Sequence, residues 1–308
     1  VPGWRGQVHR LAPLAAVPGL ASALLLADGA SLELPWLLTG VVLTLDPVGR
    51  VFLLLAAVLW GAAAGFARGY LAADPGRDRF LGFFLASMAG NLGLTTAQDP
   101  VTFLAFFALM GLPAYGLVAH TRTAFARRAA NVYLGAAVTG ETLTLAGLLL
   151  AVGAAEPGAG ALLLVAGLGV KAGLLPLHFW LPLAHPAAPA PASAVLSGTM
   201  IKAGLLGWLR FLPLGEAALP GPGTALFLLG LAAAFLAVIA GLGQRDPKTV
   251  LAYSSISQMG WLAAAVGAGL LAPGAWAGLQ VAVLAYALHH GLAKGALATT
   301  PAWDACNL

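Results

Sequence analysis

The stretch KAGLLPLHFWLPLAHPAAPAPASAVLSGTMIKAGLLGWLR, residues 171–210, decides how this chain folds. It contains two apolar segments and, between them, a connector that is rich in proline from Pro176 to Pro191. Lys171 lies inside the first segment and Lys202 inside the second. A lysine in the middle of a membrane helix costs about 2.5–3.5 kcal/mol or more to insert, so it usually faces a polar interior. We therefore expect two membrane helices with inward-facing lysines, joined by a cytoplasmic connector.

The composition of the whole chain supports a membrane protein. Of its 308 residues, 60% are apolar and 8% are charged, whereas soluble proteins carry roughly 25% charged residues. The net charge of +4 comes from basic residues scattered among the predicted loops, which argues against nucleic-acid binding. The single Cys306 excludes an intramolecular disulfide and offers no cluster for a metal or an iron–sulfur centre.

Apolar runs of about 20 residues predict an all-α polytopic membrane protein with about ten transmembrane helices. We take the run after Arg10 as a first span rather than a signal peptide, because many further apolar runs follow it. The turn at Asp99-Pro100 separates the third and fourth helices, and the loop around Trp36 is expected to hold a short interfacial element. The predicted limits are 10–27, 47–69, 80–97, 100–119, 131–153, 160–181, 191–212, 224–243, 250–271 and 275–298.

Charges in the connectors predict the topology. Alternate connectors are basic and carry Arg5, Arg10, Arg68, Arg77, Arg79, Arg122, Arg127, Arg128, Arg245 and Lys248. The intervening connectors carry mainly Asp28, Glu33, Asp46, Asp99, Glu156 and Glu216, with Arg50 and Arg210 near helix ends. The positive-inside rule places the basic connectors in the cytoplasm. We therefore expect both ends of the chain to be cytoplasmic, in a bacterial cytoplasmic membrane.

Lysine is rare in this chain, and its positions suggest a path for protons. Lys171, Lys202 and Lys294 lie inside predicted helices, and Lys248 lies at the start of one. Lysine loses its proton readily when it is desolvated, whereas arginine stays charged. The alternative is that these side chains extend to the membrane surface, which suits Lys248 best.

Glu141 lies in the middle of the fifth predicted helix and needs a cationic partner if it is ionised. Lys171 on the next helix is the candidate, and such a pair can load and release a proton. The alternative is a protonated, hydrogen-bonded glutamic acid. His178 follows Lys171 by seven residues, which predicts the same helix face.

Other polar residues extend the candidate path. His185 lies in the proline-rich connector, and His290 precedes Lys294 by one helical turn, with His289 beside it. Each histidine is either a proton carrier or a packing residue. Two clusters of polar residues add to this pattern: the first favours a broken helix near Lys202, and the second favours hydrogen bonds between helices. They are Ser193, Ser197 and Thr199 in the first, and Tyr253, Ser254, Ser255, Ser257 and Gln258 in the second.

With these features placed, the chain resembles the antiporter-like subunits of the complex I superfamily, over roughly residues 30–297. These include large membrane subunits of NADH:quinone oxidoreductase, hydrogenase-4-type membrane subunits and Mrp antiporters. The motifs that carry the resemblance are DPVGRVFLLLAAV, FLAFFALMGLPAYGLV, KAGLLPLHFWLPLAHPAAPAPASAVLSGTMIKAG, DPKTVLAYSSISQMG and HHGLAKGAL.

The resemblance implies inverted five-helix repeats, each with a broken helix, and lysines that relay protons across the bilayer centre. It implies a single membrane domain over 1–308, with N-terminal helices in 1–79, a first repeat in 80–212 and a partial second repeat in 224–298. The broken helix of the first repeat falls around Ser193–Lys202. The relay then comprises Glu141, Lys171, His178, Lys202, Lys248, His290 and Lys294. Its polar lining comprises His185, Ser193, Ser197, Thr199, Ser254 and Ser255.

Three departures from the family pattern matter. Ala108 stands where the family usually has a glutamate, and Glu141 is the candidate replacement. Leu183 stands where respiratory subunits often have an aspartate, which favours hydrogenase-type or divergent members. The chain stops at Leu308, before the expected second broken helix, so we expect a fragment or a truncated product.

These features predict a proton-translocating subunit of a respiratory or hydrogenase-type membrane complex. The chain is expected to hold no cofactor, with quinone, flavin and iron–sulfur clusters confined to partner subunits. Its expected partners are other membrane subunits, protons, Na⁺ in some members, and the lipid bilayer. The alternatives are an Mrp-type cation/proton antiporter subunit without redox coupling and a degenerate structural subunit.

Overall fold

The computed structural model describes residues 9–300 except 39 and 154–156, so Arg5, Glu156 and Cys306 lie outside the described residues. The chain forms two compact units, which interleave along the sequence. Unit 1 consists of Val1–Asn131, Ala187–Met200 and Gly291–Leu308, and unit 2 consists of Val132–Pro186 and Ile201–His290. The predicted division into successive repeats stays a prediction, and each unit is described here by itself.

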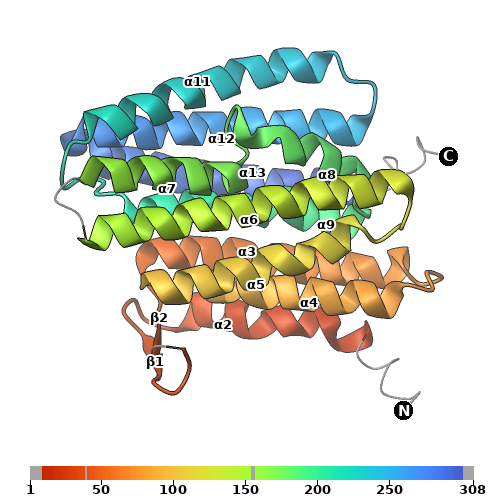
Figure 1. Ribbon diagram of the computed structural model, residues 1–308. Helices are drawn as coiled ribbons and strands as arrows, with labels where there is room; N and C mark the ends of the chain where they lie inside the picture. The colour runs from red at the N-terminus through yellow and green to blue at the C-terminus, as the bar shows by residue number, and fades with distance from the viewer. Residues whose placement is uncertain (1–8, 39, 154–156, 301–308) are drawn as a thin grey trace. The chain divides into compact units, whose positions relative to one another are not determined.

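The long helices of unit 1 run side by side, and a small β-hairpin lies at one end of them (Figure 1). Its elements are η1 (Ala12–Ala16), α2 (Val17–Leu25), β1 (Ser31–Leu34), β2 (Val41–Thr44), α3 (Pro47–Tyr70), α4 (Arg77–Leu94), α5 (Pro100–Val118), α9 (Ala190–Val195) and the π-helix η3 (Leu196–Met200). The two strands pair antiparallel with Ser31 opposite Thr44. Trp36, in the hairpin turn, is 78% exposed, as expected for an interfacial residue.

Unit 2 contains most of α6, the longest of the described helices, and all of α12 (Figure 1). Its elements are α6 (Ala124–Gly153), α7 (Pro157–Ala172), η2 (Leu177–Trp180), α8 (Leu181–Ala187), α10 (Lys202–Phe211), α11 (Pro220–Leu242), α12 (Pro247–Leu271), η4 (Pro273–Ala275) and α13 (Trp276–Ala298). The first residues of α6 and the last residues of α13 belong to unit 1.

The helical prediction is confirmed, because each predicted segment contains a helix. Among the described residues, seven helices are long and apolar enough to cross a membrane. Three of the helices begin at an Asp-Pro pair, where the aspartate caps the helix and proline fits the first turn. Asp46 accepts a hydrogen bond from the Gly49 N–H at 3.1 Å. Asp99 and Asp246 do the same for α5 and α12.

The basic connectors of unit 1 meet at one end of its helices. Arg79 donates to the backbone carbonyl of His120 at 2.9 Å, which joins the start of α4 to the end of α5. At the other end, Gln98 donates to Asp46 at 2.8 Å, which joins the acidic connectors. The alternation of charge in the sequence therefore corresponds to two opposite ends of unit 1.

One prediction about the proline-rich stretch is wrong. The helix predicted over 160–181 ends at Ala172, because Gly173 adopts a φ of +73° and turns the chain. His178 is therefore not on a continuous helix face with Lys171 but lies beyond the break, in η2. The predicted connector contains the short helix α8, in which His185 is only 1% exposed. Its apolar alanines and leucines explain why it folds into the protein instead of into water.

Candidate functional site

The buried ammonium of Lys171 is the centre of the candidate site. Lys171 lies in the last turn of α7 and is 4% exposed. Its Nζ donates to the hydroxyl of Tyr133 on α6 at 3.1 Å, and it lies 5.3 Å from the centre of the Tyr133 ring. A cation near an aromatic face and a hydroxyl is stabilised by both groups. The site therefore holds a charge-bearing side chain inside an apolar protein.

Glycines bring α6 and α7 into close contact beside this lysine. A Cβ on Gly140 would lie 3.0 Å from the carbonyl oxygen of Gly167 and 3.1 Å from Val170. Small residues at a helix interface allow the two backbones to approach in this way. Glu141 and Lys171 are the next residues along each helix, so the close approach positions both.

Glu141 lies within electrostatic reach of Lys171, as the sequence predicted for this pair. Glu141 is half-buried, and its Oε1 atom has no hydrogen-bond partner among the described residues. An open acceptor on a half-buried carboxylate can take a proton or accept from a water molecule. The structure thus places a carboxylate and an ammonium on two closely packed helices, while their pairing and their part in a relay stay predictions.

Trp180 closes the site from the chain segment after the break. Its indole Nε1 donates to the backbone carbonyl of Val170 at 2.7 Å, and its ring contacts Tyr133 edge-on with centroids 5.3 Å apart. The same carbonyl also accepts from the Gly173 N–H at 3.2 Å, so Trp180 adds a second donor at the end of α7. Trp180 therefore holds both the helix end and the tyrosine that contacts Lys171.

Sequence reasoning missed Tyr133 and Trp180. Tyr133 precedes Glu141 by eight residues, slightly more than two helical turns, so helical spacing on 131–153 places both on one face. Trp180 had no such indication, because its position depends on the break at Gly173.

The other predicted relay residues of unit 2 are mostly buried. Lys202 is fully buried at the start of α10, and Lys248 is 5% exposed in the first turn of α12. His290 is buried, whereas the neighbouring His289 is exposed. His178 is half-buried, with its ring 6.3 Å from that of Tyr253.

A buried polar cluster in unit 1 surrounds the interruption near Lys202. The predicted broken helix is α9, followed by the π-helix η3 and then α10. Within η3, Thr199 donates to the side-chain oxygen of Asn91 at 2.6 Å, and Trp60 donates to the same oxygen at 2.8 Å. A π-turn in a helix is often found at a functional position. Ser193 and Ser197 are buried in the same segment.

The segment of α13 within unit 1 packs on the π-helix. A Cβ on Gly291 would lie 2.7 Å from the carbonyl oxygen of Gly198, so the two backbones nearly touch. Lys294 follows Gly291 by three residues and is 5% exposed. Unit 1 therefore contains the π-helix and one buried lysine of the predicted path.

Two residues of the polar cluster in α12 make the predicted hydrogen bonds between helices. Ser257 donates to the carbonyl of Ala234 on α11 at 2.7 Å, and Tyr286 on α13 donates to Gln258. Ser255 instead bonds the carbonyl of Leu251 on its own helix, and Ser254 is half-buried.

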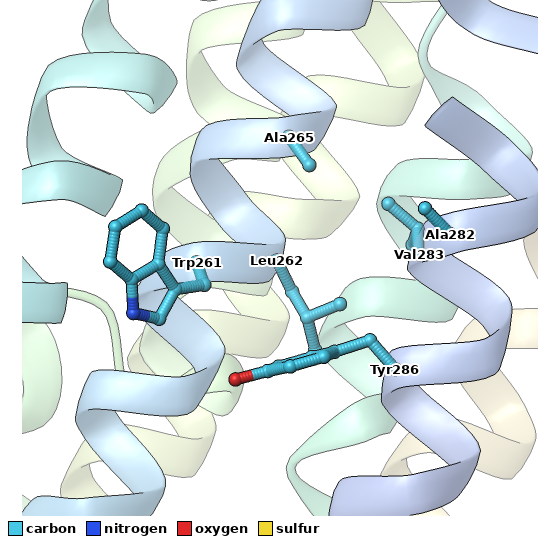
Figure 2. A pocket seen from close by; sticks show the side chains of 6 residues that line it. All are labelled: Trp261, Leu262, Ala265, Ala282, Val283 and Tyr286. Carbon is cyan, nitrogen blue, oxygen red and sulfur yellow. The ribbon is translucent and has the colours of Figure 1, made fainter. Parts of the chain in front are cut away.

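A hollow of about 410 Å³ lies between α12 and α13 in unit 2 (Figure 2). Tyr286 reaches from α13 towards α12 along one side of it. The hollow is lined by Trp261, Leu262, Ala265, Ala282, Val283 and Tyr286. The lining is apolar apart from the tyrosine hydroxyl and the indole nitrogen, unlike the charged surroundings of Lys171. In the described part of the chain, no three histidine, cysteine or acidic side chains are grouped as a metal site requires.

This chain is similar in sequence to a known family of membrane proteins. The model of the family "NADH:quinone oxidoreductase/Mrp antiporter, TM" matches residues 137–298. NADH-quinone oxidoreductase subunit N of Desulforudis audaxviator is 33% identical over 288 residues, which is 85% of this chain and 55% of the relative. Hydrogenase-4 component B of Escherichia coli is 30% identical over 243 residues, 71% of this chain and 36% of the relative.

The fold is also similar to that of solved membrane complexes. The structure of the Mrp complex from Dietzia sp. DQ12-45-1b contains a chain that matches with a TM-score of 0.80 and 26% identity, over 96% of this chain and 34% of that one. This chain thus spans about half the length of the first curated relative and about a third of the Mrp protein.

Proposed function

Since this chain belongs to the NADH:quinone oxidoreductase/Mrp antiporter transmembrane family, we propose that it translocates protons as a subunit of a larger membrane redox complex. The named relatives, an NADH-quinone oxidoreductase subunit and a hydrogenase-4 component, support this class of complex.

One observation carries the proposal: the contact of the buried Lys171 ammonium with Tyr133 on α6, the helix that also carries Glu141. The charge of each ionisable partner changes the proton affinity of the other. Protonation of Glu141 removes the charge that stabilises the lysine, so the lysine releases its proton more readily. Tyr133 holds the ammonium in place while the carboxylate changes state. This chemistry moves a proton without any redox group in this chain.

The remaining relay residues extend this step in the proposal. Lys202, His290 and Lys294 are buried in apolar helices, where a proton travels by way of side chains and ordered water. In this proposal, Lys248, His178 and the polar lining belong to the same proton path. Quinone, flavin and iron–sulfur clusters belong to the partner subunits in this scheme. The basic connectors lie on the cytoplasmic side of a bacterial membrane, as the positive-inside rule predicts.

A second candidate function is cation/proton antiport without redox coupling. The match to the Mrp complex, with a TM-score of 0.80 over 96% of this chain, favours it. The two functions differ in what drives transport: electron transfer in the first, and a gradient of Na⁺ or another cation in the second.

Proton and sodium uptake into vesicles that contain the full complex tests both functions. Lys171→Ala and Lys202→Ala are expected to abolish proton uptake, and Glu141→Gln to reduce it strongly. Thr142→Val is the matched control, because Thr142 follows Glu141 on α6 but is exposed, and its hydroxyl bonds the Val138 carbonyl in its own helix.

Normal transport in both lysine variants would contradict a lysine relay. Uptake that follows electron-donor addition identifies redox-driven pumping, whereas uptake that follows an imposed Na⁺ gradient identifies antiport. A wild-type complex that moves neither ion would favour a structural subunit.

A further inference from the structure

An open hollow of about 590 Å³ lies in unit 1, where α3 ends and α4 begins. Three arginines and two glycines line it: Arg10, Gly65, Arg68, Gly69 and Arg77. Three guanidinium groups around one space create a strong local positive potential. Such a space attracts an anion.

The three guanidinium groups have no ion pair or hydrogen bond with any residue that the structure describes. The carboxylates nearby have other partners: Asp78 pairs with His9 at 2.5 Å, and Asp74 pairs with His120 at 2.8 Å. Among the described residues, no acidic group therefore neutralises these three arginines, and they can bind an anion.

The glycines give the hollow an apolar floor that continues along α3. A Cβ on Gly65 or Gly69 would meet nothing within 4 Å. One turn earlier the same face is covered, because a Cβ on Gly61 would lie 3.4 Å from Ala16 of η1. On the η1 side, Leu11 and Leu14 are more than half exposed. A cationic rim above a bare apolar helix face fits an amphipathic molecule better than a free inorganic anion.

The surroundings add charge of the same sign. The end of unit 1 that holds the hollow also carries Arg79, Arg122, Arg127 and Arg128. Connectors of this kind face the cytoplasmic leaflet, where anionic lipids are found, and basic pockets between membrane helices bind their head groups.

We propose that this hollow binds an anionic phospholipid. Its phosphate lies among the guanidinium groups of Arg10, Arg68 and Arg77, and one acyl chain lies along the face of α3 that Gly65 and Gly69 leave bare. The site shares no residue with the predicted proton path, whose buried lysines include Lys171, Lys202 and Lys294.

Titration of the detergent-purified full complex with cardiolipin, followed by native mass spectrometry, tests the phosphate contacts. A double variant, Arg68→Gln with Arg77→Gln, is expected to weaken cardiolipin binding about 30-fold, at roughly 1 kcal/mol for each arginine. The matched control is Arg127→Gln with Arg128→Gln, which removes the same charge from the same end of unit 1 but outside the hollow. Equal weakening in both double variants would mean general surface attraction and would overturn the site.

Gly65→Leu tests the acyl-chain contact separately. The leucine fills the bare face without a clash and leaves the arginines unchanged, so it is expected to weaken cardiolipin binding at least several-fold. Gly82→Leu on α4, which also meets nothing within 4 Å, is the control that keeps full binding. Displacement of cardiolipin by inorganic phosphate alone, or full binding in Gly65→Leu, would indicate a simple anion site and would overturn the lipid proposal.

Discussion

At the scale of single residues, the contact between Lys171 and Tyr133 governs the candidate site. The hydroxyl of Tyr133 fixes the position of the ammonium, and Trp180 fixes the ring of Tyr133. A buried donor that loses its acceptor costs about 1–3 kcal/mol. The tyrosine therefore matters both to the stability of unit 2 and to the position of the charge.

Tyr133→Phe removes this acceptor and keeps the ring. We expect the free energy of unfolding to fall by about 1–3 kcal/mol, and proton uptake to fall with it, because the ammonium loses its fixed partner. Unfolding in detergent and vesicle uptake measure the two effects. Tyr115→Phe on α5, where the tyrosine is half-buried, is the control. Unchanged uptake in Tyr133→Phe would remove the tyrosine from the relay.

The pair of Asp74 and His120, which lies outside the membrane-spanning helices, leads to a second prediction about single residues. Burial raises the pKa of Asp74, but the hydrogen bonds from His120 and from the Gly76 N–H outweigh burial, so its pKa lies below the ordinary value. A carboxylate with a lowered pKa stabilises the fold at higher pH, and this stability is lost as the pH falls through the folded pKa. We expect thermal stability to decline below about pH 4, and Asp74→Asn to show a smaller decline. An identical acid profile in the variant would contradict this role.

The residues of the site were only partly predictable from the sequence. Lys171 and Glu141 stood out because charge is rare and costly in apolar helices. Tyr133 could have been predicted from its spacing of eight residues from Glu141. Trp180 and Asn91 were not, because each acts on a residue far away in the sequence: Asn91 bonds Thr199. The sequence around an aromatic or amide residue in an apolar run does not show which distant residue it will bond.

At the scale of elements, glycines decide which helices pack most closely. On the α11–α12 pair, a Cβ on Gly230 would lie 2.5 Å from the backbone nitrogen of Ala264. A Cβ on Gly260 would lie 2.5 Å from that of Ala234. Side chains at these positions would force the helices apart, since a packed interior has little free space.

Gly260→Leu is therefore expected to destabilise the protein by about 1–3 kcal/mol or more. Gly135→Leu, on α6 where a Cβ would meet nothing within 4 Å, is expected to be tolerated. Thermal unfolding of the purified protein compares the two variants. Equal stability of both would show that the α11–α12 contact tolerates separation.

The helices themselves were predictable, because a membrane helix needs a long apolar run and little else. The break after Ala172 was not, because the residues Gly173, Leu174 and Leu175 continue the apolar run without a polar interruption. The helix in the proline-rich connector was not predicted either, because proline disfavours a helix interior, yet Pro186 lies within α8. The π-helix has no distinctive composition apart from Gly198.

At the scale of the whole molecule, the chain interleaves two compact units. Residues 187–200 and 291–300 belong with the N-terminal helices and not with their neighbours in sequence. Apolar periodicity cannot reveal such pairings, because every membrane helix in this chain has a similar composition. The family resemblance could indicate a repeat architecture but not these boundaries.

Membrane orientation is the prediction that belongs to this scale. In a background with Cys306→Ser, a cysteine at Trp36 is expected to react with a membrane-impermeant thiol reagent from outside the cell. A cysteine at Thr121, in the basic connector after α5, is expected to react only after the membrane is opened. Both positions are exposed and lie at opposite ends of unit 1. The reverse labelling pattern would invert the topology.

The close packing of α11 on α12 has a consequence for how the chain is made. The two helices are joined by a short turn and press their glycines against each other, so each provides the surface that the other needs. During synthesis, this pair can form as soon as α12 has left the ribosome, before α13 exists. We therefore expect the hairpin to enter the bilayer as one preassembled piece, around which the later part of unit 2 is completed.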